Sequence, residues 1–207
     1  MSVTVQPIPI LTATAPAVPD MPIYRLTVEQ YLAMAEAGIL TEDDPVELLE
    51  GWLVQRMTKN PPHIVATGSL VDFIPPLLPG GWFLTIQDPI ATPDSLPEPD
   101  VALIRGARRD YLQRRPKAAD IALVVEVADT SLEQDRGLKK RLYARAGIVV
   151  YWIVNLVDEQ IEVYSEPTGP ADEPTYLQHQ SYAREDEIPL VLDGNEVARL
   201  RVRELLP

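Results

Sequence analysis

Glu126 interrupts an apolar run, Ile121–Ala128, in which every other side chain is hydrophobic. Burying an unpaired carboxylate costs several kcal/mol, so such a residue requires a cation, a hydrogen-bond network or a proton. If the run is a strand, Glu126 shares one face with Val124 and Ala128. A structural ion pair would also satisfy the carboxylate. Buried charges gather at functional sites, however, and this favours a functional role.

A second carboxylate, Asp100, stands where a proline-rich loop turns into the apolar segment Val101–Ile104. Pro99 fixes its own backbone and directs Glu98 towards an extended conformation. A Pro-Asp pair alone carries little weight, because strands often begin in this way. Together with Glu126, however, Asp100 could supply oxygen ligands from a neighbouring strand to Mg²⁺ or Mn²⁺.

A cationic group follows these carboxylates in the segment Asp135–Arg141, at the start of an expected helix. Basic residues near a helix N-terminus oppose the helix dipole, a small penalty that calls for a reason. A lysine of this segment, directed back towards the strand ends, could stabilise charge on a phosphoryl group or position an attacking water. The alternative is a solvated run of charges.

Other polar residues are weaker candidates. His63, near a helix start, could bind phosphate or carry protons, although a capping or surface role is favoured. Asp135 could brace Lys139 from four residues away on the same helix. Glu50 lies in a turn and is expected to be solvated. Three aromatic residues are expected in the core: Tyr143, Tyr151 and Trp152.

Two basic segments flank the strands that carry the carboxylates and could hold a nucleic-acid backbone. A solvated basic face without a partner is the equally weighted alternative. The first segment contains Arg105, Arg108, Arg109, Arg114, Arg115 and Lys117, and the second contains Arg136, Lys139, Lys140, Arg141 and Arg145.

The net charge of −13 argues against a surface that coats nucleic acid indiscriminately. A local basic patch on an acidic body can still bind it. The chain has no cysteine, which excludes disulfides and thiolate metal sites and fits a reducing cytoplasm. An acidic excess also suits hard cations, which prefer oxygen ligands.

The N-terminal segment 1–22 contains repeated prolines and is expected to be a flexible arm, followed by a single domain over 23–207. No basic residue precedes Arg25, so the segment lacks the charged start of an export signal. No uninterrupted apolar run is long enough for a transmembrane helix. We therefore expect a cytoplasmic protein without membrane contact.

The first half of the domain alternates helix and hairpin signals. Thr27 and Gln30 fit a capping box at the start of a helix that Gly38 would end. Residues 46–56 read as a hairpin turning near Glu50–Gly51. Beyond it we expect a helix over 62–74, strands over 82–90 and 100–104, and a helix or basic loop over 107–115.

The second half contains a strand–helix–strand unit. The continuous apolar character of 121–128 predicts a central strand buried on both faces. Ser131 and Gln134 repeat the capping pattern before a helix to about Ala146, which Gly147 closes. A strand over 149–157 then implies a right-handed parallel crossover. Antiparallel strands are expected over 161–164, 175–182 and 190–192, which makes the fold mixed α/β.

The order of these elements resembles the PD-(D/E)XK restriction-endonuclease superfamily, and most closely the bacterial Uma-two family of predicted endonucleases. The resemblance covers about residues 24–165. It rests on Glu47-Leu-Leu-Glu-Gly51, His63 after a Pro pair, Glu98-Pro-Asp-Val101, Val125-Glu-Val127, Asp135-Arg-Gly-x-Lys139, Leu142-Tyr143, Ala146-Gly-Ile148 and Tyr151-Trp-Ile-Val154.

The resemblance implies a restriction-endonuclease-like fold in which Asp100 and Glu126 ligate the metal and Lys139 is the catalytic lysine. It implies that Glu47 adds a carboxylate from the first hairpin. The chain departs from the superfamily pattern at Ala128, where a lysine is usual. The family resemblance places that lysine at Lys139, on the following helix.

We therefore expect an endonuclease, dependent on Mg²⁺ or Mn²⁺, that hydrolyses DNA and acts as a homodimer. Two alternatives belong to other classes. One is a catalytically silent module that binds nucleic acid or a protein partner, as the displaced lysine and the acidic charge would allow. The other is an antiparallel β-rich interaction domain, which would require Glu126 to be exposed.

Overall fold

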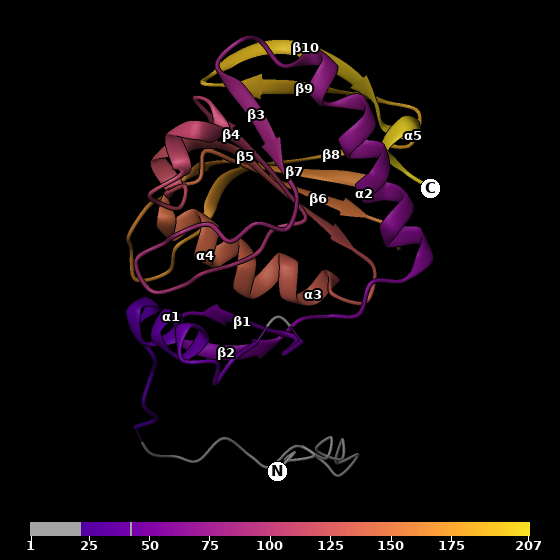
Figure 1. Cartoon of the computed structure of the whole chain (residues 1–207). Helices are drawn as coiled ribbons and strands as arrows, with labels where there is room; N and C mark the ends of the chain where they lie inside the picture. The colour runs from indigo at the N-terminus through magenta and orange to yellow at the C-terminus, as the bar shows by residue number, and fades with distance from the viewer. Residues whose placement is uncertain (1–21, 42) are drawn as a thin grey trace.

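A six-stranded mixed sheet forms the centre of the molecule (Figure 1), in a computed structural model that describes residues 22–41 and 43–207. The strands lie in sequence order, and only β5 and β6 are parallel. The predicted mixed α/β fold is confirmed. The strands are β3 (Trp82–Thr85), β4 (Val101–Arg105), β5 (Ile121–Ala128), β6 (Val150–Asn155), β7 (Gln160–Pro167) and β8 (Tyr176–Ala183).

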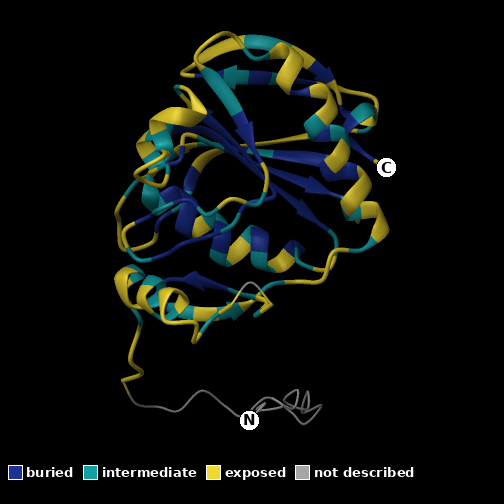
Figure 2. Ribbon diagram, in the orientation of Figure 1, coloured by how far each residue is buried: buried dark blue, intermediate teal, exposed yellow. Residues whose placement is uncertain are grey.

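Residues of β5 alternate between two cores, as a strand covered on both faces requires. Leu123, Val125 and Val127 belong to the core under α2 (Pro61–Phe73) and the C-terminal hairpin. Val124 and Ala128 belong to the core under the helix that follows β5. All eight residues of β5 are buried (Figure 2), so the prediction of a central strand is confirmed.

The crossover from β5 to β6 contains α3 (Leu132–Gln134), a π-helical turn (Asp135–Lys139) and α4 (Lys140–Ala146). Gly147 ends it in the left-handed conformation, at φ 79°. The sequence predicted a continuous helix capped by Ser131. Instead, the Ser131 hydroxyl donates to Asp135 at 2.6 Å and makes no capping bond. π-Helical turns occur mostly as single insertions and often mark functional sites.

The N-terminal part confirms two local predictions. Thr27 and Gln30 form the capping box of α1 (Val28–Glu36). The hairpin of β1 (Val46–Leu49) and β2 (Trp52–Gln55) turns at Glu50 and Gly51, both at positive φ. A Cβ on Gly51 would lie 2.6 Å from the Cβ of Arg25, so the close approach also requires glycine there.

Glu50 was expected to be solvated, and this prediction is wrong. The residue is 7% exposed and pairs with Arg141 at 2.7 Å and with Arg145 at 3.2 Å. Both arginines lie on α4. The turn therefore anchors the first hairpin to the helix that follows the central strand.

The strand predicted over 82–90 ends early, at Thr85. Gln87 takes a positive φ of 55°, and Pro89 has no N–H to donate to a strand ladder. The segment instead bonds to the proline-rich loop, since the N–H groups of Gln87 and Ile90 donate to Pro99 and Pro97 at 3.0 Å. Residues 107–115 contain one 3-10 turn, Arg108–Tyr111.

The C-terminal segment forms a separate hairpin of β9 (Glu187–Leu192) and β10 (Asn195–Arg201), followed by α5 (Val202–Leu205). The sequence analysis predicted only part of β9. It did not predict β10, because polar and apolar residues alternate too weakly there to indicate a strand. Within the described residues, no helix has both the length and the apolar character needed to cross a membrane. The predicted arm, except Pro22, lies outside those residues.

Candidate active site

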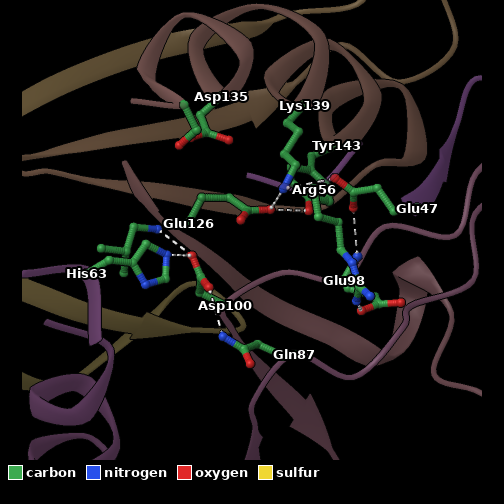
Figure 3. Close-up of polar contacts among 12 residues, drawn as sticks. Glu47, Arg56, His63, Gln87, Glu98, Asp100, Glu126, Asp135, Lys139 and Tyr143 are labelled. Carbon is green, nitrogen blue, oxygen red and sulfur yellow. Dashed lines mark hydrogen bonds and ion pairs between the residues drawn. The ribbon is translucent and has the colours of Figure 1, made fainter. Parts of the chain in front are cut away.

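Asp100 and Glu126 lie opposite each other on adjacent strands. The pairing of Val101 with Val125 makes Asp100 and Glu126 the next facing pair at the end of β4. Such opposite residues have Cβ atoms roughly 4.5–5.5 Å apart. Asp100 is 7% exposed and Glu126 3% exposed, and both line one cavity of about 230 Å³ (Figure 3). The exposed Glu126 required by a β-rich interaction domain is therefore excluded.

Asp100 is held by three donors. His63 Nε2 lies 3.0 Å from Oδ2, the Val127 N–H donates to the same oxygen at 2.9 Å, and Gln87 donates to Oδ1 at 3.2 Å. Burial disfavours the charged form, but the hydrogen bond and charge of His63 and the Val127 N–H outweigh it. The pKa of Asp100 is therefore lowered. The carboxylate is oriented and ionised.

Glu126 has a different environment. Its Oε1 accepts from Lys139 Nζ at 3.0 Å and from the Tyr143 hydroxyl at 2.6 Å. Among the described residues, no donor contacts Oε2. Burial raises the pKa of Glu126 to about 8; Lys139 opposes the increase, whereas the charges of Asp135, Asp100 and Glu47 add to it. Lys139 alone therefore does not offset the burial and the neighbouring negative charges, and a further cation would favour the ionised form of Glu126.

Lys139 joins the helix to the first hairpin. Its Nζ lies 3.5 Å from Glu47 Oε1, and Glu47 Oε2 accepts from the Glu98 N–H at 3.2 Å. Burial alone would lower the pKa of Lys139, but the negative charges of Glu126, Glu47 and Asp135 raise it above its ordinary value. The buried ammonium is therefore charged.

Asp135, predicted to brace Lys139, lines the same cavity and acts on Lys139 through its charge, without a direct ion pair among the described residues. It is 1% exposed and accepts a hydrogen bond from Ser131. The ion pairs of Lys139 are with Glu126 and Glu47. Burial raises the pKa of Asp135 to about 6, against the opposing effects of Lys139 and Ser131. The helix thus adds a third acidic side chain near the two strand carboxylates.

Sequence reasoning missed several residues that support the site. Asn60 caps α2 by accepting from the His63 N–H at 3.0 Å and also donates to Asp129. The order Asn-Pro-Pro before His63 could have been recognised in the sequence as the capped start of a helix. Tyr143, expected only as core, is buried and also lies four residues after Lys139 on the same helix face. Gln87 carried no signal, because it belongs to an irregular loop.

The basic residues are unequally available for a partner. Arg105 pairs with Asp193, Arg114 with Asp120 and Arg141 with Glu50. Arg108 donates to the Leu84 carbonyl, and Lys140 lies over the Tyr164 ring. Within the described part of the chain, five other basic residues are exposed and have no ion pair: Arg25, Lys59, Arg109, Arg115 and Lys117.

The donor chemistry of this cavity fits a hard divalent cation. Mg²⁺ is usually held by one or two carboxylates and keeps several waters. Asp100 and Glu126 supply such a pair, and the Oε2 atom of Glu126 has no protein donor. Over the residues described, no group of three His, Asp or Glu side chains is arranged to hold a metal. The cavity therefore fits a cation with two protein carboxylates and water, while Lys139 neutralises Glu47.

Comparisons with known proteins agree with this architecture. The model of the Uma2 family, described as "Putative restriction endonuclease", matches residues 28–200. A crystal structure of "a putative nuclease belonging to DUF820" from Anabaena variabilis is similar in fold, with a TM-score of 0.63 and 15% sequence identity. The match covers 87% of this chain and 97% of that one. No curated protein matches the chain.

Proposed function

The chain belongs to the Uma2 family of restriction-endonuclease-like proteins, and from this we propose that it is a metal-dependent endonuclease that hydrolyses DNA phosphodiester bonds. One observation supports the proposal above the others. Two buried carboxylates from adjacent strands, Asp100 and Glu126, share a cavity with a buried ammonium, Lys139, that lies 3.0 Å from Glu126.

Each residue has a distinct task in this proposal. Asp100 and Glu126 hold the Mg²⁺ or Mn²⁺ ion, which when bound lowers the pKa of a water and polarises the phosphate. His63 and the Val127 N–H keep Asp100 ionised and oriented towards the cavity. Lys139 stabilises negative charge on the phosphoryl oxygens, and Glu47 fixes the position of its ammonium.

The test is plasmid cleavage with Mg²⁺ or Mn²⁺ by the wild type and by Asp100→Asn and Glu126→Gln. Each substitution keeps the size of the side chain but removes its charge, so cleavage should fall to background while the circular dichroism spectrum is unchanged. Asp72→Asn is the matched control, because Asp72 is exposed on α2 and lies outside the cavity. Metal-dependent cleavage that survives in either site variant would defeat the proposal.

A catalytically silent module is the second candidate, favoured by one observation. Lys139 already contacts both Glu126 and Glu47, as in a purely structural ion cluster. Calorimetric titration with Mn²⁺ separates the two candidates. A nuclease binds the ion and loses that binding in Glu126→Gln, whereas a silent module shows no heat that depends on Glu126.

A further inference from the structure

A second pocket adjoins the loop that borders the active site. Gln87 lines the active-site cavity, and its neighbour Asp88 lines this pocket. The pocket has a volume of about 480 Å³, within the range of roughly 300–1,000 Å³ typical of sites for small organic groups. Its floor comes from β3 and its far wall from the segment 111–116.

The hydroxyl of Thr85 indicates that this pocket receives a ligand. Thr85 is 6% exposed and lines the pocket. Among the described residues, its Oγ1 is the single buried side-chain oxygen or nitrogen without a hydrogen-bond partner. Native proteins pair nearly all such groups, and leaving one unpaired costs about 1–3 kcal/mol. The oxygen itself is fully buried, so a ligand with a polar edge would satisfy it once the side chain rotates towards the pocket.

The walls of the pocket suit a flat ring. Phe83 shares the strand face of Thr85, and its ring lies 5.7 Å from that of Tyr111. The Arg108 guanidinium lies 5.1 Å from the centre of the Phe83 ring, and that of Arg114 lies 4.6 Å from Tyr111. Nucleobases stack on aromatic rings and on guanidinium planes alike.

The charged side chains at the pocket favour a nucleotide that places its base inside and its phosphate at the rim. Asp88 also lines the pocket, and a carboxylate repels phosphate but accepts from the amino group of a base. Arg115 is exposed at the pocket and has no ion pair among the described residues, so it is free to contact a phosphate. We propose that this pocket holds an unpaired nucleobase, so that the protein prefers nucleic acid with a single-stranded segment.

This inference deepens the proposed function and rests on it, because the base would belong to the strand presented to the neighbouring carboxylates. It is tested by binding without cleavage. A short fluorescein-labelled single strand of mixed sequence, and the same strand in a blunt duplex, are titrated with the wild type in EDTA and followed by fluorescence anisotropy. The single strand should bind more tightly than the duplex.

Thr85→Val separates a recognition role from a structural one. Valine keeps the shape and removes the unpaired hydroxyl, so the melting temperature should rise or stay equal. Affinity for the single strand should nevertheless fall about fivefold, as the loss of one hydrogen bond predicts. If the unpaired hydroxyl has no role in recognition, the melting temperature of Thr85→Val should still rise or stay equal, but its affinity for the single strand should be unchanged. That result would overturn the proposal.

Arg115→Gln gives an independent test, with Arg203→Gln as its matched control. Arg203 is an exposed arginine on α5, outside both cavities. Arg115→Gln should weaken single-strand binding, and the control should not. Equal effects of the two variants, or equal wild-type affinity for single strand and duplex, would also overturn the proposal. Loss of cleavage in Glu126→Gln is measured separately, so failure of this proposal can be told apart from failure of the proposed function.

Discussion

Lys139 is the residue on which the stability of the site depends most directly. Its ammonium contacts two buried carboxylates, Glu126 and Glu47. Removing one partner of a buried ion pair leaves an uncompensated charge and costs about 3–5 kcal/mol. A carboxylate can avoid part of that penalty by taking up a proton, so the effect of the lysine depends on pH.

Replacing Lys139 by Met should therefore destabilise the protein more in alkaline than in acidic solution. The pKa of Glu126 is raised from 4.5 to about 8 in the folded state, so folding binds a proton between these values and stability falls as pH rises. Without Lys139 the pKa rises further. Urea unfolding should show a loss of about 3 kcal/mol above pH 8 and a smaller loss near pH 5. Lys117→Met, at an exposed position, is the control.

Metal affinity should depend on the protonation of the same carboxylate, Glu126, but it should rise with pH where the folding stability falls. A ligating carboxylate must lose its proton, so Mn²⁺ affinity should increase as pH rises towards about 8, the pKa of Glu126, and level off above it. Calorimetry in buffers of different ionisation enthalpy should detect protons released on binding near neutral pH. A flat affinity profile, with no proton release, would contradict the assignment of Glu126 as a ligand.

At the scale of elements, the N-terminus of α2 connects stability to the site. Asn60 caps the helix through the His63 N–H, and His63 in turn contacts Asp100. The cap therefore fixes the first turn of the helix, which carries the imidazole. A comparable cap, Thr27 on α1, has no contact with the cavity.

Asn60→Ala and Thr27→Ala should thus have similar effects on stability and different effects on activity. Loss of either cap should lower the free energy of unfolding by about 1 kcal/mol. Only Asn60→Ala should also reduce the rate of plasmid cleavage, because it releases the turn that positions His63. Equal cleavage rates in the two variants, at equal stability, would show that the orientation of His63 is unimportant.

Elements whose signals are local could be predicted from the sequence. The capping box at Thr27, the hairpin turn at Gly51 and the apolar strand around Glu126 all depend on neighbouring residues. The π-helical turn could not be predicted, because the extra residue is accommodated by tertiary contacts of Asp135 and Lys139. The early end of β3 depends on Gln87 bonding to a loop that is distant in sequence.

In the candidate site, too, some residues could be predicted from the sequence and others only from the structure. Intrusive charge in an apolar strand identified Glu126, and the start of a second apolar strand indicated Asp100 as its companion. The family resemblance then singled out Lys139 and added Glu47. The partners that orient them were not predictable. Tyr143 looked like an ordinary core residue, and Glu50 in a turn looked solvated, because only the packing of the first hairpin against α4 brings arginines to it.

At the scale of the whole molecule, the proposed function requires an acidic protein to bind a polyanion, which it can do only through a small surface. In the segment 105–117, several arginines have internal partners, which leaves Arg109, Arg115 and Lys117 exposed without ion pairs; Arg25 and Lys59 are in the same state elsewhere in the described chain. Arg109→Gln should lower the salt dependence of DNA binding by about one unit of log–log slope. Arg105→Gln should change it less, since Asp193 already neutralises Arg105. Anisotropy titrations over a range of salt concentrations measure both slopes.

The parallel pairing of β5 with β6 has a consequence for synthesis on the ribosome. Every acidic residue of the site emerges before Lys139, but the helix bearing that lysine is secured only when β6 (Val150–Asn155) pairs beside β5. A parallel pair cannot form before the crossover is complete. A nascent chain that carries all the acids but lacks β6 should therefore be unable to cut, which would delay any cleavage until the core has closed.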